Sequence, residues 1–369
     1  FMVIWDAEKG ESITLDFRER APGAATRDMF TKAGPDGTVP SSQKGGMAIG
    51  VPGQVAGLCH ALKHYGTLPL ETVIAPALRF AEEGVPFDAH EVAGRRAIAK
   101  EFEEDPTLQV KYRGLWEDYL REGRLTVGDT FHSPQAAALR VLAAEGPAAF
   151  YTGDMARALV ECVAAQGGVL RRDDLAAMDV VSRKPILAHF DDVRIFSMAP
   201  PSSGGIALVE TLNIMTAFEA KGALANRAHN SPEYLQLLTE SMKYAFADRG
   251  TYLGDADFHA VPVARLTSLA HAQSIAARIQ LDQTRAPSAY GAAVAPDDSG
   301  TTHYAVMDGS GNAVACTETI NTAFGSWVVE PEYGIVLNNE MDDFTARPGE
   351  PNAFGLMQSE SNTVGPRHK

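Results

Sequence analysis

Two adjacent threonines, Thr301 and Thr302, stand in a setting that favours chemistry. Threonine is common at the start of strands, so a structural role is the competing interpretation. Gly300 precedes the pair, and a flexible residue there lets its peptide bond strain towards attack by the next hydroxyl. The segment before it is rich in Pro, Gly, Ala and Ser, as expected of a region that separates after cleavage. Thr319 and Asn321 follow on the returning strand of an expected hairpin, where they could face Thr301.

A threonine that becomes a chain terminus carries its own base. Its free α-amine, with a reference pKa of about 7.7–8.0, can accept the hydroxyl proton near neutral pH. No separate histidine is then needed, which suits a sequence with no evident Ser-His-Asp set. The residues therefore allow a nucleophile that is released by cleavage before Thr301.

An acidic stretch, NNEMDDF at 338–344, contains Glu340, Asp342 and Asp343. Three interpretations compete: a solvated turn, a Ca²⁺ site, and a pocket for a cationic group. The spacing is not that of an EF-hand loop. The flanking asparagines and Phe344 favour a buried polar site over an exposed tip.

A second candidate motif, PPSSGG at 200–205, has the glycines and serines of a phosphate cradle. It lacks the Gly-Lys-Ser/Thr ending of a P-loop, and Ser202 and Ser203 lack nucleophile-elbow spacing. We expect the tight start of a helix at this position.

Composition limits the class of protein. The chain has 369 residues, 45% of them hydrophobic and 21% charged, which is typical of a globular protein. A net charge of -15 and a pI near 5.1 argue against nucleic-acid binding. The sequence contains no run of about 18 apolar residues, so we predict no membrane-spanning helix. Cys59, Cys162 and Cys316 are interpreted as small buried hydrophobes, and Cys59 with its neighbouring histidines lacks a usual zinc ligand set. We expect no metal and no cofactor.

The expected elements alternate between hairpins and helices. Hairpins are predicted over 1–17, over 187–198 and over 302–320, the last with a GSGN turn. Helices of about 10–12 residues should follow Pro52 and Pro69, and the stretch 101–170 should be mostly helical. A further helix should begin with Ser231 as N-cap and Pro232 at its first position. Its apolar face is predicted to comprise Leu235, Leu238, Met242 and Ala245. The pattern predicts a layered α+β fold.

Six stretches together resemble the γ-glutamyltransferase family (γ-glutamyltranspeptidase, glutathione hydrolase) of the N-terminal-nucleophile hydrolase superfamily. In chain order they are DFRERAPGAATRDMF, GVPGQVAGL…YGTLPL, PPSSGGIALVETLNI, KYAFADRGTYLGD, TTHYAVMDGSGNAVACTETINTAFGS and GIVLNNEMDDF. The resemblance implies a four-layer αββα sandwich, of which this chain would be an incomplete fragment. It also implies autocatalytic cleavage between Gly300 and Thr301. A large subunit (1–300) and the start of a small subunit (301–369) would then form one intertwined domain and a heterodimer.

The resemblance assigns roles residue by residue. Thr301 would be the nucleophile and Thr319 the second threonine that bonds to it and helps activate it. Arg18 would hold the substrate α-carboxylate, a task for a planar bidentate donor. The α-ammonium would be held by Asn321, Glu340 and Asp343. Phe354, in TARPGEPNAFGL, matches an aromatic of a lid loop, with an ordinary surface loop as the alternative.

The implied reaction is two-step acyl transfer. Thr301 attacks the γ-amide of glutathione or a related γ-glutamyl compound, and the resulting ester passes to water or to an amino-acid or dipeptide acceptor. The alternatives are a cephalosporin or glutaryl acylase of the same superfamily and a degenerate, non-catalytic member. We expect a periplasmic or secreted location, as is usual for bacterial members.

The sequence departs from the family pattern at both ends. The chain stops at VGPRHK, before the serine pair that contacts the substrate carboxylate and the glycine pair of the oxyanion hole. The N-terminal helices and the Gly-rich run that precede FM in the family are absent as well. We expect that the chain is part of a longer protein and that the fragment alone is nearly inactive.

Overall fold

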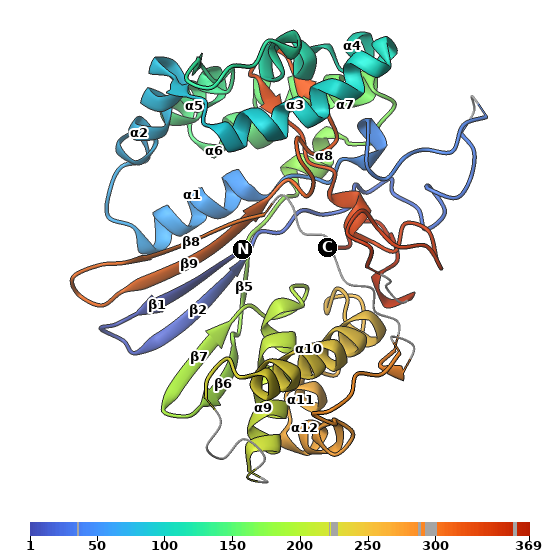
Figure 1. Ribbon diagram of the computed structural model, residues 1–369. Helices are drawn as coiled ribbons and strands as arrows, with labels where there is room; N and C mark the ends of the chain where they lie inside the picture. The colour runs from blue at the N-terminus through green and yellow to red at the C-terminus, as the bar shows by residue number, and fades with distance from the viewer. Residues whose placement is uncertain (35–36, 221, 223–227, 287–288, 292–300, 357–359) are drawn as a thin grey trace.

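The computed structural model describes residues 1–34, 37–220, 222, 228–286, 289–291, 301–356 and 360–369 (Figure 1). At its centre is a five-stranded sheet in the order β5-β2-β1-β9-β8. Its strands are β1 (Met2–Asp6), β2 (Glu11–Asp16), β5 (Val181–Arg183), β8 (Thr301–Met307) and β9 (Ala313–Thr319). Every pairing in it is antiparallel. The hairpins predicted over 1–17 and 302–320 are confirmed as β1–β2 and β8–β9, and β9 pairs with β1 at the centre of the sheet. Gly300 lies outside the described residues.

One face of the sheet is apolar and packs on helix α1 (Gln54–Tyr65), which runs along the sheet in Figure 1. Met2 lies opposite both Leu15 and Cys316, and all three side chains join one buried cluster with Leu58 of α1. Successive strand residues point to opposite faces, so neighbours of these residues in the sequence point away from α1. This alternation decides on which face the candidate nucleophile lies.

A helical layer lies on the α1 side of the sheet and contains the largest apolar cluster of the described residues (Figure 1). Its helices are α2 (Leu70–Glu83), α3 (Ala89–Glu104), α4 (Pro106–Lys111), α5 (Ala136–Glu145), α6 (Pro147–Tyr151), α7 (Asp154–Ala165) and α8 (Arg172–Ala176). Two short strand pairs join it: β3 (Val85–Pro86) with β4 (Thr130–Phe131), and β10 (Val329–Glu330) with β11 (Ile335–Val336). The helices predicted after Pro52 and Pro69 are confirmed as α1 and α2.

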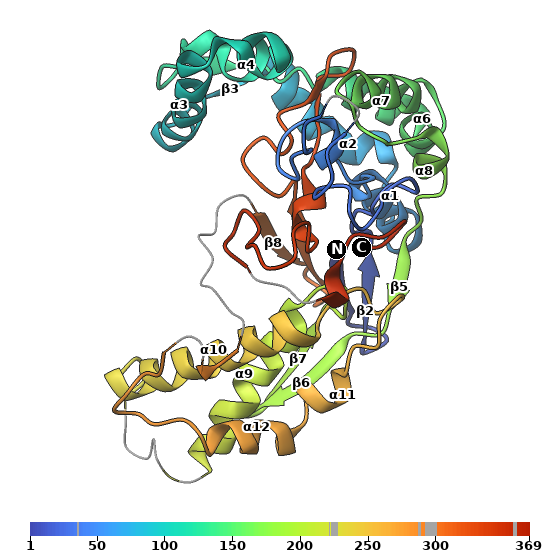
Figure 2. The same ribbon diagram turned by 90° about the vertical axis from the view of Figure 1, so that its right-hand side faces the viewer.

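A second helical unit follows β5 in the chain. It contains the hairpin of β6 (Ile186–Phe190) and β7 (Val193–Ser197), as predicted, and the helices α9 (Gly204–Glu219), α10 (Pro232–Tyr252), α11 (Val263–Leu266) and α12 (Leu269–Ala276). Helix α9 begins directly after PPSS, as predicted for this motif. In Figures 1 and 2 alike, α9, α10 and α12 pack side by side.

Helix α10 begins as predicted, with the Ser231 hydroxyl accepting a hydrogen bond from the Tyr234 N–H. Half of its predicted apolar face is confirmed, because Ala245 is buried and Leu238 packs against the buried cluster, whereas Leu235 and Met242 are exposed, 45% and 44% respectively. The helix also buries Leu237 and Tyr244 against α9 and α12. The mixed character of its buried side explains the error, since Glu240 and Ser241 are also buried there.

The described residues form an α+β fold, as predicted. None of the described helices is both long and apolar enough to cross a membrane. The three cysteines are free thiols; Cys316 is fully buried, whereas Cys59 and Cys162 are partly exposed.

Candidate active site

The two candidate threonines, Thr301 and Thr319, lie directly opposite each other at one end of the sheet. Thr301, the first residue of β8, pairs with Thr319, the last residue of β9. Directly opposed residues point to the same face, with Cβ atoms about 4.5–5.5 Å apart. Cys316 and the paired Tyr304 point to the α1 face of the sheet. Thr319 and Thr301 each lie three positions from these residues along their strands, so both threonines point to the opposite face. β8 is an edge strand and Thr301 is exposed, which leaves its hydroxyl accessible.

Thr319 is fixed by the turn that follows it. The Asn321 N–H donates to the Thr319 Oγ1 atom at 2.8 Å. Asn321 has φ 76°, a left-handed conformation that asparagine tolerates better than most residues. Its buried Nδ2 atom donates to the Asn339 carbonyl at 3.0 Å, which ties this turn to the acidic stretch. The structure therefore links Thr319, Asn321 and residues 338–344 into one unit.

Arg18 lies at the same end of the sheet as the threonines. Leu15, Cys316 and Tyr304 lie in one row across the sheet. Arg18, Thr319 and Thr301 each lie three positions from this row, in the same direction along the sheet. Strands β2 and β8 are three spacings apart, so their backbones are separated by about 14 Å. A substrate held at Arg18 would thus extend along this end of the sheet towards Thr301.

Arg18 lies among three carboxylates. Its Nε atom donates to Glu19 at 2.7 Å, its Nη2 atom donates to Asp343, and Glu340 is 3.8 Å away. Burial by itself would lower the pKa of Arg18, but Glu19, Asp343 and Glu340 together raise it well above its usual value. The guanidinium is permanently charged and 23% exposed, so it can also meet an incoming anion.

The acidic stretch is buried, so the solvated-turn interpretation is wrong. Glu340 to Asp343 form a short 3₁₀ turn in which Glu340 and Asp342 are 2% and 1% exposed. Asp342 accepts hydrogen bonds from the Ser42 hydroxyl at 2.6 Å and the Ala353 N–H at 2.7 Å. Its role is therefore structural, since it holds residues 41–43 and 351–356 in place.

Glu340 has a different environment. Within the described part of the chain, neither of its side-chain oxygens accepts a hydrogen bond. Burial, followed by the nearby Glu19 and Asp343 carboxylates, raises the pKa of Glu340 well above its usual value. Burial and the Asp343 carboxylate also raise the pKa of Glu19, although Arg18 acts against this shift. A buried carboxylate without a hydrogen bond is costly, and an added cation would relieve that cost.

A hollow of about 90 Å³ opens beside Arg18. It lies below the roughly 300–1,000 Å³ of typical ligand pockets, so it can hold only part of a substrate. Its polar lining includes Arg18, Glu19, Ser203, Arg249 and Asp343. Arg249 donates to the Ser203 hydroxyl at 2.9 Å and adds a second guanidinium that can attract an anion.

Sequence reasoning did not single out Glu19 or Arg249. Glu19 adjoins Arg18, and Arg249 lies in KYAFADRGTYLGD, one of the stretches that carry the family resemblance. Phe354, the predicted lid residue, is half-buried on a loop whose N–H groups at Phe354 and Leu356 donate to Asn352. It is not among the described residues that line the hollow beside Arg18.

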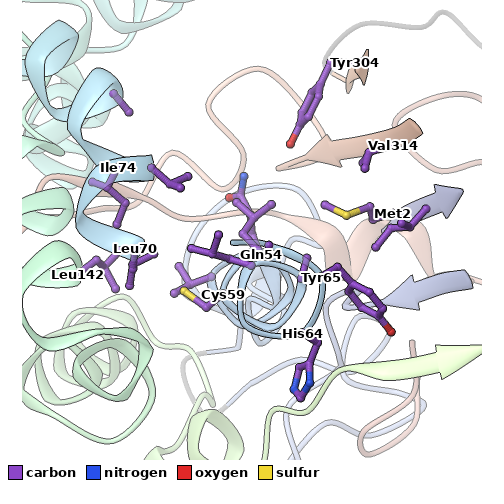
Figure 3. Close-up of a pocket in the computed structure, with 18 of the residues that line it drawn as sticks. Met2, Gln54, Cys59, His64, Tyr65, Leu70, Ile74, Leu142, Tyr304 and Val314 are labelled. Carbon is purple, nitrogen blue, oxygen red and sulfur yellow. The ribbon is translucent and has the colours of Figure 1, made fainter. Parts of the chain in front are cut away.

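A cavity of about 1310 Å³ lies on the other face of the sheet. Figure 3 shows it between Met2, Val314 and Tyr304 of the sheet, Gln54 and Cys59 of α1, and Leu70 and Ile74 of α2. Its described lining includes neither Thr301 nor Arg18. The candidate chemistry is therefore not in this cavity.

The fold is similar to those of a solved transpeptidase and a solved acylase. The chain is similar to γ-glutamyltranspeptidase from Helicobacter pylori, with a TM-score of 0.69, 34% identity, and coverage of 78% of this chain and 80% of that one. It is also similar to a cephalosporin acylase from Bacillus halodurans, with a TM-score of 0.80, 25% identity, and coverage of 100% and 63%.

The sequence pattern of the gamma-glutamyltranspeptidase family matches residues 1–369, and the chain belongs to this family. It is 40% identical to the glutathione hydrolase proenzyme of Escherichia coli (strain K12) over 376 aligned positions. That alignment covers 100% of this chain and 62% of the relative, so the chain spans less than two thirds of that protein's length.

Proposed function

We propose that the protein transfers γ-glutamyl groups, with Thr301 as the nucleophile and glutathione and related γ-glutamyl amides as donors. The observation that carries this proposal is the charge pattern at one end of the sheet. A guanidinium, Arg18, lies beside the buried carboxylate of Glu340 and next to Asp343, at the same end as the opposed threonines. An α-amino acid end, with one anion and one cation, matches this pattern.

The proposed reaction begins when the precursor is cut between Gly300 and Thr301, which frees the α-amine of Thr301. That amine accepts the hydroxyl proton as the Thr301 oxygen attacks the γ-carbonyl, and Thr319 supports the nucleophile. The amine half leaves with the proton, and a γ-glutamyl ester remains. Water then releases glutamate, or an amino acid or dipeptide takes the γ-glutamyl group. Because both α-charges are held, the γ-carbonyl and not the α-carbonyl reaches the hydroxyl.

Within this proposal Arg18 holds the α-carboxylate, and Asn321, Glu340 and Asp343 hold the α-ammonium. The complete protein would form a four-layer αββα sandwich from a large subunit that includes residues 1–300 and a small subunit that begins with residues 301–369. The central position of β9, next to β1, supports an intertwined arrangement of the two. A lid role for Phe354 and export to the periplasm or medium rest on the resemblance to bacterial family members.

The test uses the full-length protein and its Thr301→Ala variant. We expect the wild type to separate into two chains by intact-mass measurement and to release p-nitroaniline from γ-glutamyl-p-nitroanilide. Thr301→Ala should stay one chain and lose roughly 10³-fold or more of this activity. Thr302→Ala is the matched control, because Thr302 alternates with Thr301 and points to the α1 face. The proposal fails if the wild type never divides or if Thr301→Ala keeps its activity.

A glutaryl acylase is the second candidate, favoured by the similarity of the whole chain to a cephalosporin acylase. Glutaryl amides lack the α-ammonium that Glu340 and Asp343 would hold. Turnover of γ-glutamyl-p-nitroanilide should therefore exceed that of glutaryl-p-nitroanilide. A preference for the glutaryl compound would favour the acylase.

A further inference from the structure

A histidine and two carboxylates meet in the second helical unit, away from the candidate active site. Glu210 lies on α9, Asp248 on α10 and His271 on α12, the three helices that pack side by side in Figures 1 and 2. The His271 Nε2 atom is 2.6 Å from Asp248 Oδ2 and 3.4 Å from Glu210 Oε1. One ligand atom from each residue lies within 4.8 Å of the other two.

Within the described residues, His271 is the only group that forms an ion-pair contact with Glu210 or Asp248. Glu210 is 1% exposed, and neither of its side-chain oxygens accepts a hydrogen bond from the described residues. Burial, followed by the neighbouring Asp248 carboxylate, raises the pKa of Glu210 to about 9, although the charge of Arg265 acts against this shift. A single imidazole N–H points at both carboxylates and can donate fully to only one of them.

Another buried glutamate, Glu240 on α10, shows how a carboxylate in this helical unit can be provided with hydrogen-bond donors. Glu240 is 2% exposed and accepts hydrogen bonds from Lys243 at 2.8 Å and from the hydroxyls of Thr284 and Tyr290. Burial would raise the pKa of Glu240, but these three donors lower it. Glu210 has no such set of donors within the described residues, so its carboxylate could accept a ligand that is not part of the chain.

We propose that Glu210, Asp248 and His271 form a binding site for a divalent metal ion of the Zn²⁺ type, which ties α9, α10 and α12 together. Zn²⁺ binds imidazole nitrogen and carboxylate oxygen at about 2.0–2.2 Å. Two such ligand atoms in a tetrahedral site are then about 3.3–3.6 Å apart. The 3.4 Å between His271 Nε2 and Glu210 Oε1 lies in this range. The 2.6 Å between His271 Nε2 and Asp248 Oδ2 would have to widen to the same range for both atoms to bind one ion.

The ligand types and the exposure support this class of ion. One imidazole with two carboxylates suits Zn²⁺ or Co²⁺, whereas Ca²⁺ and Mg²⁺ favour an all-oxygen set. The side chains of His271 and Asp248 are 16% and 22% exposed, so an ion can enter and water can complete its coordination. The inference does not depend on the proposed γ-glutamyl activity.

The experiment measures metal binding to the full-length protein after treatment with EDTA. His60 and His64 must first be removed, because their rings lie 4.3 Å apart on α1 and offer a rival surface site. In the His60→Gln/His64→Gln background we expect Zn²⁺ to bind with a stoichiometry of one by calorimetry and to raise Tm. Co²⁺ should give the visible absorption of a four- or five-coordinate ion without thiolate bands.

Glu210→Gln and His271→Gln should each weaken Zn²⁺ binding by at least about 10-fold. Glu219→Gln on the same helix α9 is the matched control and should bind as the background does, because Glu219 is exposed. If either ligand variant fails to fold, the Co²⁺ spectrum of the background protein decides. The proposal is overturned if no ion binds in that background, or if folded Glu210→Gln and His271→Gln bind like the control. In that case Glu210 holds a proton instead of a metal.

Discussion

Two buried carboxylates near the same end of the sheet, Asp16 and Glu340, have opposite surroundings. Asp16 is 0% exposed and forms ion pairs with Lys369 at 2.6 Å and Arg183 at 2.7 Å. It also accepts the Arg18 N–H at 3.0 Å. Glu340 is 2% exposed, accepts no hydrogen bond from the described residues, and has Arg18 at 3.8 Å.

The pKa shifts of the two groups follow these surroundings. Burial would raise the pKa of Asp16, but Lys369 and Arg183 outweigh it and lower this pKa. Burial and neighbouring carboxylates raise that of Glu340. We infer that Asp16 supports the fold and positions Arg18, whereas Glu340 is held ready for a cation. A stabilising network is complete in the free protein, whereas a binding site is completed by its ligand.

The largest expected effect is on stability at Asp16. Asp16→Asn leaves the buried Lys369 without its anion and Arg183 with Asp257 as its remaining carboxylate partner, so we expect the free energy of unfolding to fall by about 3–5 kcal/mol. Denaturant titration of the full-length protein measures this change. Asp179→Asn is the control: it removes an exposed ion pair with Arg20 and should cost at most about 1 kcal/mol. A loss at Asp16 as small as that of the control would show that this network is not the support that we infer.

The sequence predicted the local parts of this region well. Alternating apolar runs and polar turns indicated both hairpins of the sheet, because strand alternation is a local signal. The opposition of Thr301 and Thr319 follows from the length of the β8–β9 turn. For NNEMDDF the sequence left a solvated turn open, although the flanking asparagines favoured a buried site; Asn338 and Asn339 are 6% and 0% exposed.

Contacts distant in the chain could not be predicted in this way. Asp16 meets Lys369 across 353 positions, and no periodicity or spacing marks such a pair. The same holds for Arg249, which reaches the hollow beside Arg18 from another helical unit. The prediction for α10 failed at Leu235 and Met242 because polar residues take part in the buried face and are satisfied by tertiary contacts, as the hydrogen bonds of Glu240 show.

The second prediction concerns substrate binding at Glu340. Glu340→Gln keeps the shape of the side chain but removes the charge that would attract the α-ammonium. We expect KM for γ-glutamyl-p-nitroanilide to rise about 10- to 100-fold, equivalent to about 1.4–2.8 kcal/mol. Turnover of glutaryl-p-nitroanilide, which has no ammonium, is the internal control and should hardly change. An equal loss on both substrates would mean that Glu340 shapes the site and does not bind the cation.

The smallest effect is a difference in pH dependence. The pKa of Glu340 is raised on folding, so its ionisation costs stability as pH rises from its unfolded value, about 4.3, towards the folded one. Unfolding free energies of wild type and Glu340→Gln should thus be similar near pH 4, with the variant becoming the more stable of the two as pH rises towards 7.

Asp16→Asn should show the opposite trend. The pKa of Asp16 is lowered on folding, so its contribution is fully present above about pH 4 and is lost as pH falls through the folded value. The penalty of Asp16→Asn should therefore shrink towards acid, while the gain of Glu340→Gln grows towards neutral pH. Urea titrations of the three proteins between pH 3 and pH 7.5 measure both trends. Parallel curves for all three would remove the distinction between a completed network and a site that awaits its cation.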